Sequence, residues 1–126
     1  MRRRLVTPLL LAPLAVLAAC GGGSSATETT IPADAGLVVK AVPTIRWDKT
    51  EYSATAGEIS VFLANDDNVK HVLVIREGDK VVGDLELIVD KRGDTDTGTI
   101  ELAAGTYSVY CIVPGHGGMN STLTVS

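Results

Sequence analysis

Apolar and polar residues alternate along much of the chain after residue 36, in short runs that end at Gly, Pro, Asp or Asn. The clearest run is 57–65, GEISVFLAN, in which Ile59, Val61 and Leu63 fall on one side of an extended chain. Because strand side chains point alternately to the two faces, this pattern predicts a half-buried strand. Further strand-like runs occupy 37–42, 69–76, 80–90, 98–102, 105–111 and 120–126, and the run 80–90 is broken at Gly83–Asp84.

These runs predict seven or eight short strands and no helix. Turn residues separate them at regular intervals, and no run repeats its apolar residues with the 3.6-residue period of a helix. Such a series is typical of an antiparallel β-sandwich. Residues 37–126 provide enough chain for one small domain and too little for two.

The first 19 residues have a different pattern. A basic start, MRRR, precedes an apolar run at 5–19 that contains two prolines. This run is shorter than a membrane-spanning helix, which needs about 20 residues. The segment LAAC at 17–20 resembles the lipobox of bacterial lipoproteins, in which the Cys is lipidated and becomes the first mature residue. We therefore expect residues 1–19 to be a lipoprotein signal peptide. The alternative is ordinary cleavage, with Cys20 as a free or disulfide-bonded thiol.

Residues 20–36 are expected to be the lipidated Cys20 and a flexible tether, because GGGSSATETTIPADAG is rich in Gly, Ser and Thr and lacks a hydrophobic period. The tether would hold the domain 37–126 at the extracytoplasmic face of a bacterial membrane.

Removal of the signal peptide makes the chain acidic. From Cys20 onward Lys and Arg fall from 11 to 8 against 15 Asp and Glu, a net charge of −7. This charge argues against nucleic acid as a partner. Five acidic residues lie in the segment 83–98, which is either a docking surface for a basic partner or a solvated loop.

The residues with metal-binding chemistry are concentrated in one short segment, YCIVPGHGGM. It holds Cys111, His116 and Met119, and the only other His of the chain is His71. The remaining Cys and Met of the chain are Cys20 and the initiator Met1. Two imidazoles and a thiolate with a weak thioether are the ligand set of a blue-copper centre.

Strand parity indicates how these residues meet. Val69, His71, Leu73 and Ile75 share one face of their run, and Cys111 ends another run with its side chain on the apolar face. The two inward side chains are therefore expected at one end of the sandwich, and Pro114–Gly115 provides a turn that returns His116 toward Cys111.

Other interpretations remain for the four residues. Each taken alone is more often structural: a buried strand His, a small buried Cys, a loop His or a gap-filling Met. Zinc accepts Cys and His, but Met is a poor zinc ligand. A Cys20–Cys111 disulfide is possible in an oxidising compartment and leaves both His unexplained. A dinuclear copper site would need a second nearby Cys.

The segments GTYSVYCIVPGHGGMNSTLTV and NDDNVKHVLVI together resemble the cupredoxins, the small blue-copper proteins of plastocyanin and azurin type. The resemblance spans roughly Val38 to Val125. It implies a Greek-key β-sandwich with one type 1 copper held by His71, Cys111, His116 and Met119. It also puts Tyr107 in the place of the tyrosine corner at a Greek-key crossover.

Two positions depart from that family. Only two residues separate His116 from Met119, fewer than in azurin-like or plastocyanin-like loops, although the span from Cys to Met is eight positions, as in plastocyanin-like loops. The residue after the first His is often Asn in the family and is Val72 here.

The function that the resemblance implies is single-electron transfer by a monomer that docks with redox partner proteins. Four protein ligands leave no evident open position for a substrate, which argues against an enzyme. The alternatives are an extracytoplasmic copper protein for storage, delivery or sensing, and a metal-free interaction module.

Overall fold

The computed structural model describes residues 29–126. The predicted signal peptide, Cys20 and the first half of the predicted tether lie outside the described residues. Within 29–126, no helix is long and apolar enough to cross a membrane.

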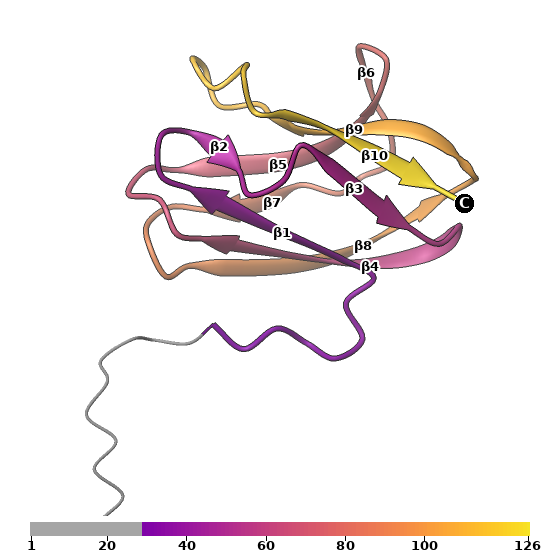
Figure 1. Ribbon diagram of the computed structural model, residues 1–126, viewed down its shortest axis with the longest axis horizontal. Coiled ribbons are helices and arrows are strands. Elements are labelled where there is room, and N and C mark those ends of the chain that lie inside the picture. Colours follow the sequence, from indigo (N-terminus) through magenta and orange to yellow (C-terminus); the bar gives the residue numbers. More distant parts are fainter. Residues whose placement is uncertain (1–28) are drawn as a thin grey trace, which may run out of the picture.

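The strands form two sheets that pack face to face (Figure 1). The first sheet has the order β2-β1-β4-β8, with β1 at Leu37–Val42, β2 at Arg46–Trp47, β4 at Gly57–Asn65 and β8 at Thr95–Leu102. The second has the order β3-β10-β9-β5-β6, and β7 also pairs with β5. Its members are β3 at Glu51–Ala54, β5 at His71–Glu77, β6 at Lys80–Val81, β7 at Leu87–Val89, β9 at Gly105–Cys111 and β10 at Asn120–Val125.

The β-sandwich predicted from the sequence is confirmed. The predicted runs 37–42, 57–65 and 105–111 coincide with β1, β4 and β9, and the run 80–90 is divided into β6 and β7. Two strands were missed, β2 and β3, because two and four residues are too few to show an alternating pattern.

The pairing is mixed rather than purely antiparallel. β1 lies parallel to β4, and β10 lies parallel to β3. In each case the chain visits other strands before returning beside its partner, so the two strands are not joined by a tight hairpin. Alternation along a strand predicts which face is buried, but it contains no information about the direction of the neighbour.

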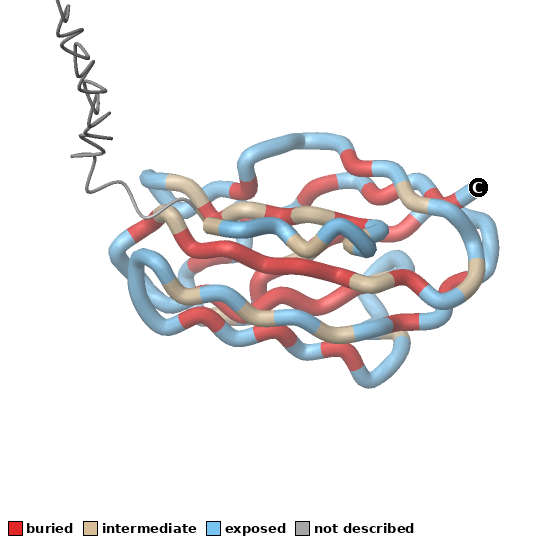
Figure 2. The backbone as a smooth tube through the Cα atoms, turned by 90° about the horizontal axis from the view of Figure 1, so that it is seen from below, coloured by how far each residue is buried: buried red, intermediate tan, exposed pale blue. Residues whose placement is uncertain are grey.

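The core lies between the sheets, where alternate side chains meet. β1 alternates strictly between buried and half-buried positions, and Figure 2 shows buried segments recurring along the strands. The predicted tyrosine corner is present, since the Tyr107 hydroxyl donates to the Ala103 carbonyl at 2.9 Å where the chain crosses from β8 to β9. This bond fixes the crossover between the sheets.

The central pair of the second sheet, β5 and β9, carries two of the predicted site residues. Leu73 of β5 is opposite Cys111 of β9, which makes His71, two residues earlier on the same face, a diagonal neighbour of Cys111. The fold therefore brings these two side chains to one end of the sandwich.

Candidate metal centre

Three of the predicted ligands converge. One ring nitrogen of His71, one ring nitrogen of His116 and the Cys111 Sγ all lie within 4.8 Å of one another. Cys111 Sγ is 3.7 Å from His116 Nδ1, and the two imidazole rings are 5.0 Å apart, centroid to centroid. Nitrogen and sulfur ligands lie about 2.0–2.3 Å from an ion such as Zn²⁺, so small side-chain movements would let one ion bind all three.

Two successive turns build the loop that carries His116. The His116 N–H donates to the Val113 carbonyl at 3.0 Å, and the Met119 N–H donates to the His116 carbonyl at 2.9 Å. Gly115 has a φ of 87°, a backbone conformation that other residues rarely adopt. The loop therefore folds back sharply enough to bring His116 over Cys111.

Met119 is anchored beside the same residues. The Cys111 N–H donates to the Met119 carbonyl at 3.1 Å, which ties the end of the loop to the end of β9. The Met119 side chain is buried and belongs to the same core cluster as Cys111. Ligation by its thioether stays a prediction.

The four side chains differ in their access to solvent. His71 and Cys111 are 0% exposed and Met119 is 1% exposed, whereas His116 is 9% exposed. His116 is therefore the one of the four residues that retains some contact with solvent. Ile112, which follows Cys111 in the chain, is also exposed.

His71 is held by Asp67, a residue that the sequence analysis did not single out. Its Nε2 lies 3.2 Å from Asp67 Oδ2. Burial lowers the pKa of His71, the hydrogen bond to Asp67 opposes this effect, and the neighbouring His116 lowers the pKa further. The ring is therefore neutral at ordinary pH, and Nε2–H donates to the carboxylate.

The other ring nitrogen of His71 is the best evidence that the site accommodates a metal. In the neutral ring with a proton on Nε2, Nδ1 carries a lone pair. This atom is buried and has no hydrogen-bond partner in the described residues. Since buried polar atoms nearly always have a partner, an unpaired imidazole nitrogen beside a buried thiol and a second imidazole matches the donor set of a metal ion.

Trp47 also lies against His71 and was not predicted as part of the site. Its indole N–H donates to the Val109 carbonyl at 3.1 Å, and its ring centroid is 6.2 Å from that of His71, with the rings tilted by 52°. Trp47 belongs to β2, one of the strands that the sequence pattern missed. The only Trp of the chain and the carboxylate four residues before His71 were the available signals.

One parity expectation was wrong. Val69 was expected to share the buried face with His71, but it is exposed and β5 begins only at His71. The Asn65 side chain donates to the Val69 carbonyl at 2.9 Å, which holds the preceding loop outside the ladder. The strand therefore starts at the first predicted ligand.

The acidic segment 83–98 contains carboxylates that stabilise their own loop. Asp94 accepts the N–H groups of Asp90 and Lys91, and Asp96 accepts the N–H of Ile88. Asp90 also lies 3.5 Å from the Lys70 ammonium. These contacts give part of the segment a local structural role, and a docking role stays a prediction.

Comparison with solved structures supports the fold. An auracyanin from Roseiflexus castenholzii matches with a TM-score of 0.59 at 21% identity, over 71% of this chain and 95% of that one. An azurin from the obligate methylotroph Methylomonas sp. strain J matches with a TM-score of 0.57 at 16% identity, over 71% and 95%. A purple cupredoxin from Nitrosopumilus maritimus matches with a TM-score of 0.55 at 19% identity, over 71% and 99%.

No family model matches the sequence, and no curated protein does. At these identities the structural matches establish the fold, and the chain has the fold of the cupredoxins.

Proposed function

We propose that this protein binds one type 1 copper ion and transfers single electrons as a non-enzymatic carrier. The observation that carries the proposal is the convergence of His71, Cys111 and His116 within a cupredoxin fold, together with the buried Nδ1 of His71, which has no hydrogen-bond partner within 29–126.

The proposed ligands are His71 Nδ1, Cys111 Sγ, His116 Nδ1 and the Met119 thioether. Two imidazoles, a thiolate and a weakly binding thioether are a donor set that favours copper over zinc. Copper bound there would supply a Cu(I)/Cu(II) couple that accepts and gives up one electron. The chain contributes a stiff set of ligands, because β5, β9 and the double turn of the loop fix three of them through backbone hydrogen bonds.

Electron exchange with a partner is proposed to occur at the His116 edge. His116 is the most exposed of the four proposed ligands, and the apolar Ile112 is 44% exposed beside the end of β9. Shape and apolar contact there would let a redox partner protein approach the ring closely. The partner is unidentified, and the protein is proposed to act as a monomer.

The protein is further proposed to be anchored through lipidated Cys20 at the extracytoplasmic face of a bacterial membrane. The support is the sequence of residues 1–36 alone. Expression of the full chain and of Cys20→Ser in a bacterium tests this point. The unsubstituted chain should be found with the membrane and the variant in the soluble fraction, and an identical distribution of the two would contradict the anchor.

The decisive experiment on function is spectroscopic. Residues 29–126 are expressed, loaded with Cu(II) and examined by visible and electron paramagnetic resonance spectroscopy, with Cys111→Ser as the matched variant. An intense visible band with narrow copper hyperfine splitting, lost in the variant, is the expected result. A colourless protein, or one in which Cu(II) only oxidises Cys111, would overturn the proposal.

Reversible one-electron voltammetry then separates electron transfer from copper handling. A carrier should cycle repeatedly without losing its metal. Release of copper on each reduction would favour storage or delivery instead.

A further inference from the structure

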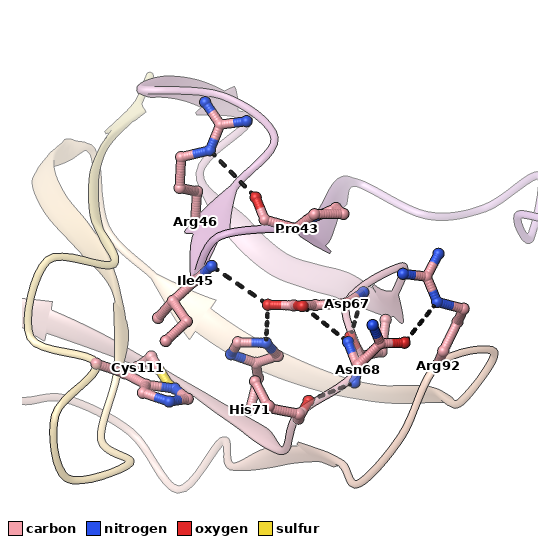
Figure 3. A network of polar contacts seen from close by, with 11 residues as sticks. Pro43, Ile45, Arg46, Asp67, Asn68, His71, Arg92 and Cys111 are labelled. Atoms are coloured by element: carbon pink, nitrogen blue, oxygen red, sulfur yellow. Dashed lines mark hydrogen bonds and ion pairs between the residues drawn. The ribbon is translucent and has the colours of Figure 1, made fainter.

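The carboxylate of Asp67 lies behind the proposed copper ligand His71, on the side away from the thiolate (Figure 3). We infer that Asp67 is a positioning residue that holds His71 as its Nε2–H tautomer and stabilises Cu(II) over Cu(I). This inference rests on the proposed function. It names a determinant of the copper reduction potential within this chain.

The Asp67 carboxylate is fixed from three directions. Its Oδ1 accepts the Asn68 N–H at 2.8 Å, and its Oδ2 accepts the Ile45 N–H at 3.3 Å besides facing His71 Nε2 at 3.2 Å. Its own backbone N–H donates to the Asn65 side chain at 2.9 Å. Asp67 is 7% exposed. A carboxylate held in this way has one orientation available, and so does the imidazole that donates to it.

The contact with Asp67 decides which nitrogen of His71 faces the other ligands. An ionised carboxylate only accepts hydrogen bonds, so the nitrogen beside it must carry the proton. The Asp67 carboxyl accepts hydrogen bonds from the backbone N–H groups of Asn68 and Ile45, and these bonds favour its ionised form. Asp67 is therefore ionised, and Nδ1 of His71 is left as the metal-facing lone pair.

The same carboxylate places a negative charge next to the ligand. Among residues 29–126, no Lys or Arg side chain forms an ion pair with Asp67, and its partner His71 is neutral. The nearby Arg92 guanidinium donates to the Asn68 side chain at 2.9 Å instead. A partly buried charge is poorly screened by solvent, and it interacts more favourably with the doubly charged metal than with the singly charged one. A carboxylate that accepts a hydrogen bond from a metal-bound His also raises the basicity of that His, which favours the more highly charged Cu(II).

A strained turn depends on the same carboxylate. Thr44 and Ile45 have φ values of 75° and 56°, a left-handed conformation that is rare for β-branched residues. The N–H of Ile45 is the donor that points at Asp67 (Figure 3). Such conformations persist where their surroundings hold them, and they concentrate at functional sites. Asp67 thus links the turn between β1 and β2 to the metal ligand.

The test compares two charge-removing substitutions in the copper-loaded protein. Asp67→Asn keeps an oxygen that can accept from His71 but removes the charge. Asp66→Asn removes the same charge one residue away, where the structure gives no side-chain contact to His71. We expect Asp67→Asn to weaken the binding of Cu(II) relative to that of Cu(I) about tenfold, which raises the one-electron reduction potential by about 59 mV. Asp66→Asn should change the potential by much less. Equal shifts in the two variants would overturn the inference.

A second measurement does not depend on copper or on the folding of a variant. Nitrogen-15 NMR of the metal-free, unsubstituted protein reports the His71 tautomer directly, and the proton is expected on Nε2. A proton on Nδ1 would overturn the inference. If the unsubstituted protein forms no type 1 centre, the proposed function fails, while the NMR result still decides whether Asp67 positions His71.

Discussion

The two histidines of the proposed site are held in opposite ways. His71 is the first residue of a central strand and is fully buried. A carboxylate lies behind one ring nitrogen, and the other has no hydrogen-bond partner in the part of the chain that the structure describes. His116 sits between two turns of an irregular, exposed loop, is itself 9% exposed, and has Nδ1 near the Cys111 sulfur. Both present a nitrogen to the same small volume, but one does so from a core strand and the other from an exposed loop.

This difference suggests a division of roles. The buried side is suited to fixing geometry and charge, because its neighbours are held by the strand ladder and by buried hydrogen bonds. The loop side is suited to contact with a partner, because it is the part of the site that reaches solvent. Stiffness and access are opposing requirements, and the protein assigns them to different ligands.

The strongest test of this division removes each imidazole in turn. His71→Gly and His116→Gly should both lose the intense visible band of the copper-loaded protein. Added imidazole should restore the band only in His116→Gly, because its gap opens to solvent while the gap at His71 is enclosed. The measurement is the visible absorption during an imidazole titration.

Equal recovery in both variants, or none in His116→Gly, would contradict the division. His71→Gly should also be less stable than His116→Gly by about 1–3 kcal/mol, because Asp67 then loses a buried hydrogen-bond partner. Chemical denaturation of the metal-free variants measures this difference.

A smaller effect is expected from a charge placed on the exposed side. Ile112→Asp introduces a carboxylate at the exposed residue that follows Cys111. Desolvating this carboxylate when two molecules approach through the proposed docking surface should slow electron self-exchange about tenfold, or about 1.4 kcal/mol in activation free energy. NMR line broadening in mixtures of the oxidised and reduced protein gives the rate. The matched control is Val81→Asp, since Val81 is 47% exposed on β6, which pairs with the other end of β5 from His71. Similar slowing in both variants would argue against the His116 edge.

The smallest expected effect tests whether the site is independent of the far end of β9. Tyr107→Phe removes the hydrogen bond to the Ala103 carbonyl and should lower the free energy of unfolding by about 0.5–1.5 kcal/mol. The copper spectrum should not change, because Cys111 lies at the opposite end of the strand.

Tyr110→Phe is the control for that substitution. It keeps the ring over which the Arg76 guanidinium lies, 4.1 Å from the centroid, and should cost less stability. A change of the copper spectrum in Tyr107→Phe would show that the crossover and the site are coupled.

The predictability of the fold followed strand length. β4 and β9 have nine and seven residues, enough for alternation to reveal their ends and their buried faces. β2 has two residues, and its place in the sheet depends on pairing with Ala41 and Val42. A strand that forms only because its partner is beside it has no recognisable pattern in its own sequence. The parallel direction of β1 and β4 likewise depends on the pairing and not on the sequence of either strand.

The candidate site was also predictable only in part. The scarcity of His, Cys and Met in the sequence and their gathering near residues 111–119 identified the candidate ligands, because the chemistry of a ligand belongs to the residue itself. The convergence of His71 with Cys111 became definite only with the register that sets Leu73 opposite Cys111.

The sequence by itself determined the β-rich fold class, the candidate ligands and the inward direction of His71 and Cys111, since these follow from residue type and the two-residue period of a strand. Only the tertiary structure decided that Asp67 stands behind His71, that Trp47 lies against it and that His116 is the more exposed imidazole. Those features depend on contacts between segments that local patterns do not specify. A carboxylate in a loop has the same local sequence whether it faces solvent or a buried imidazole.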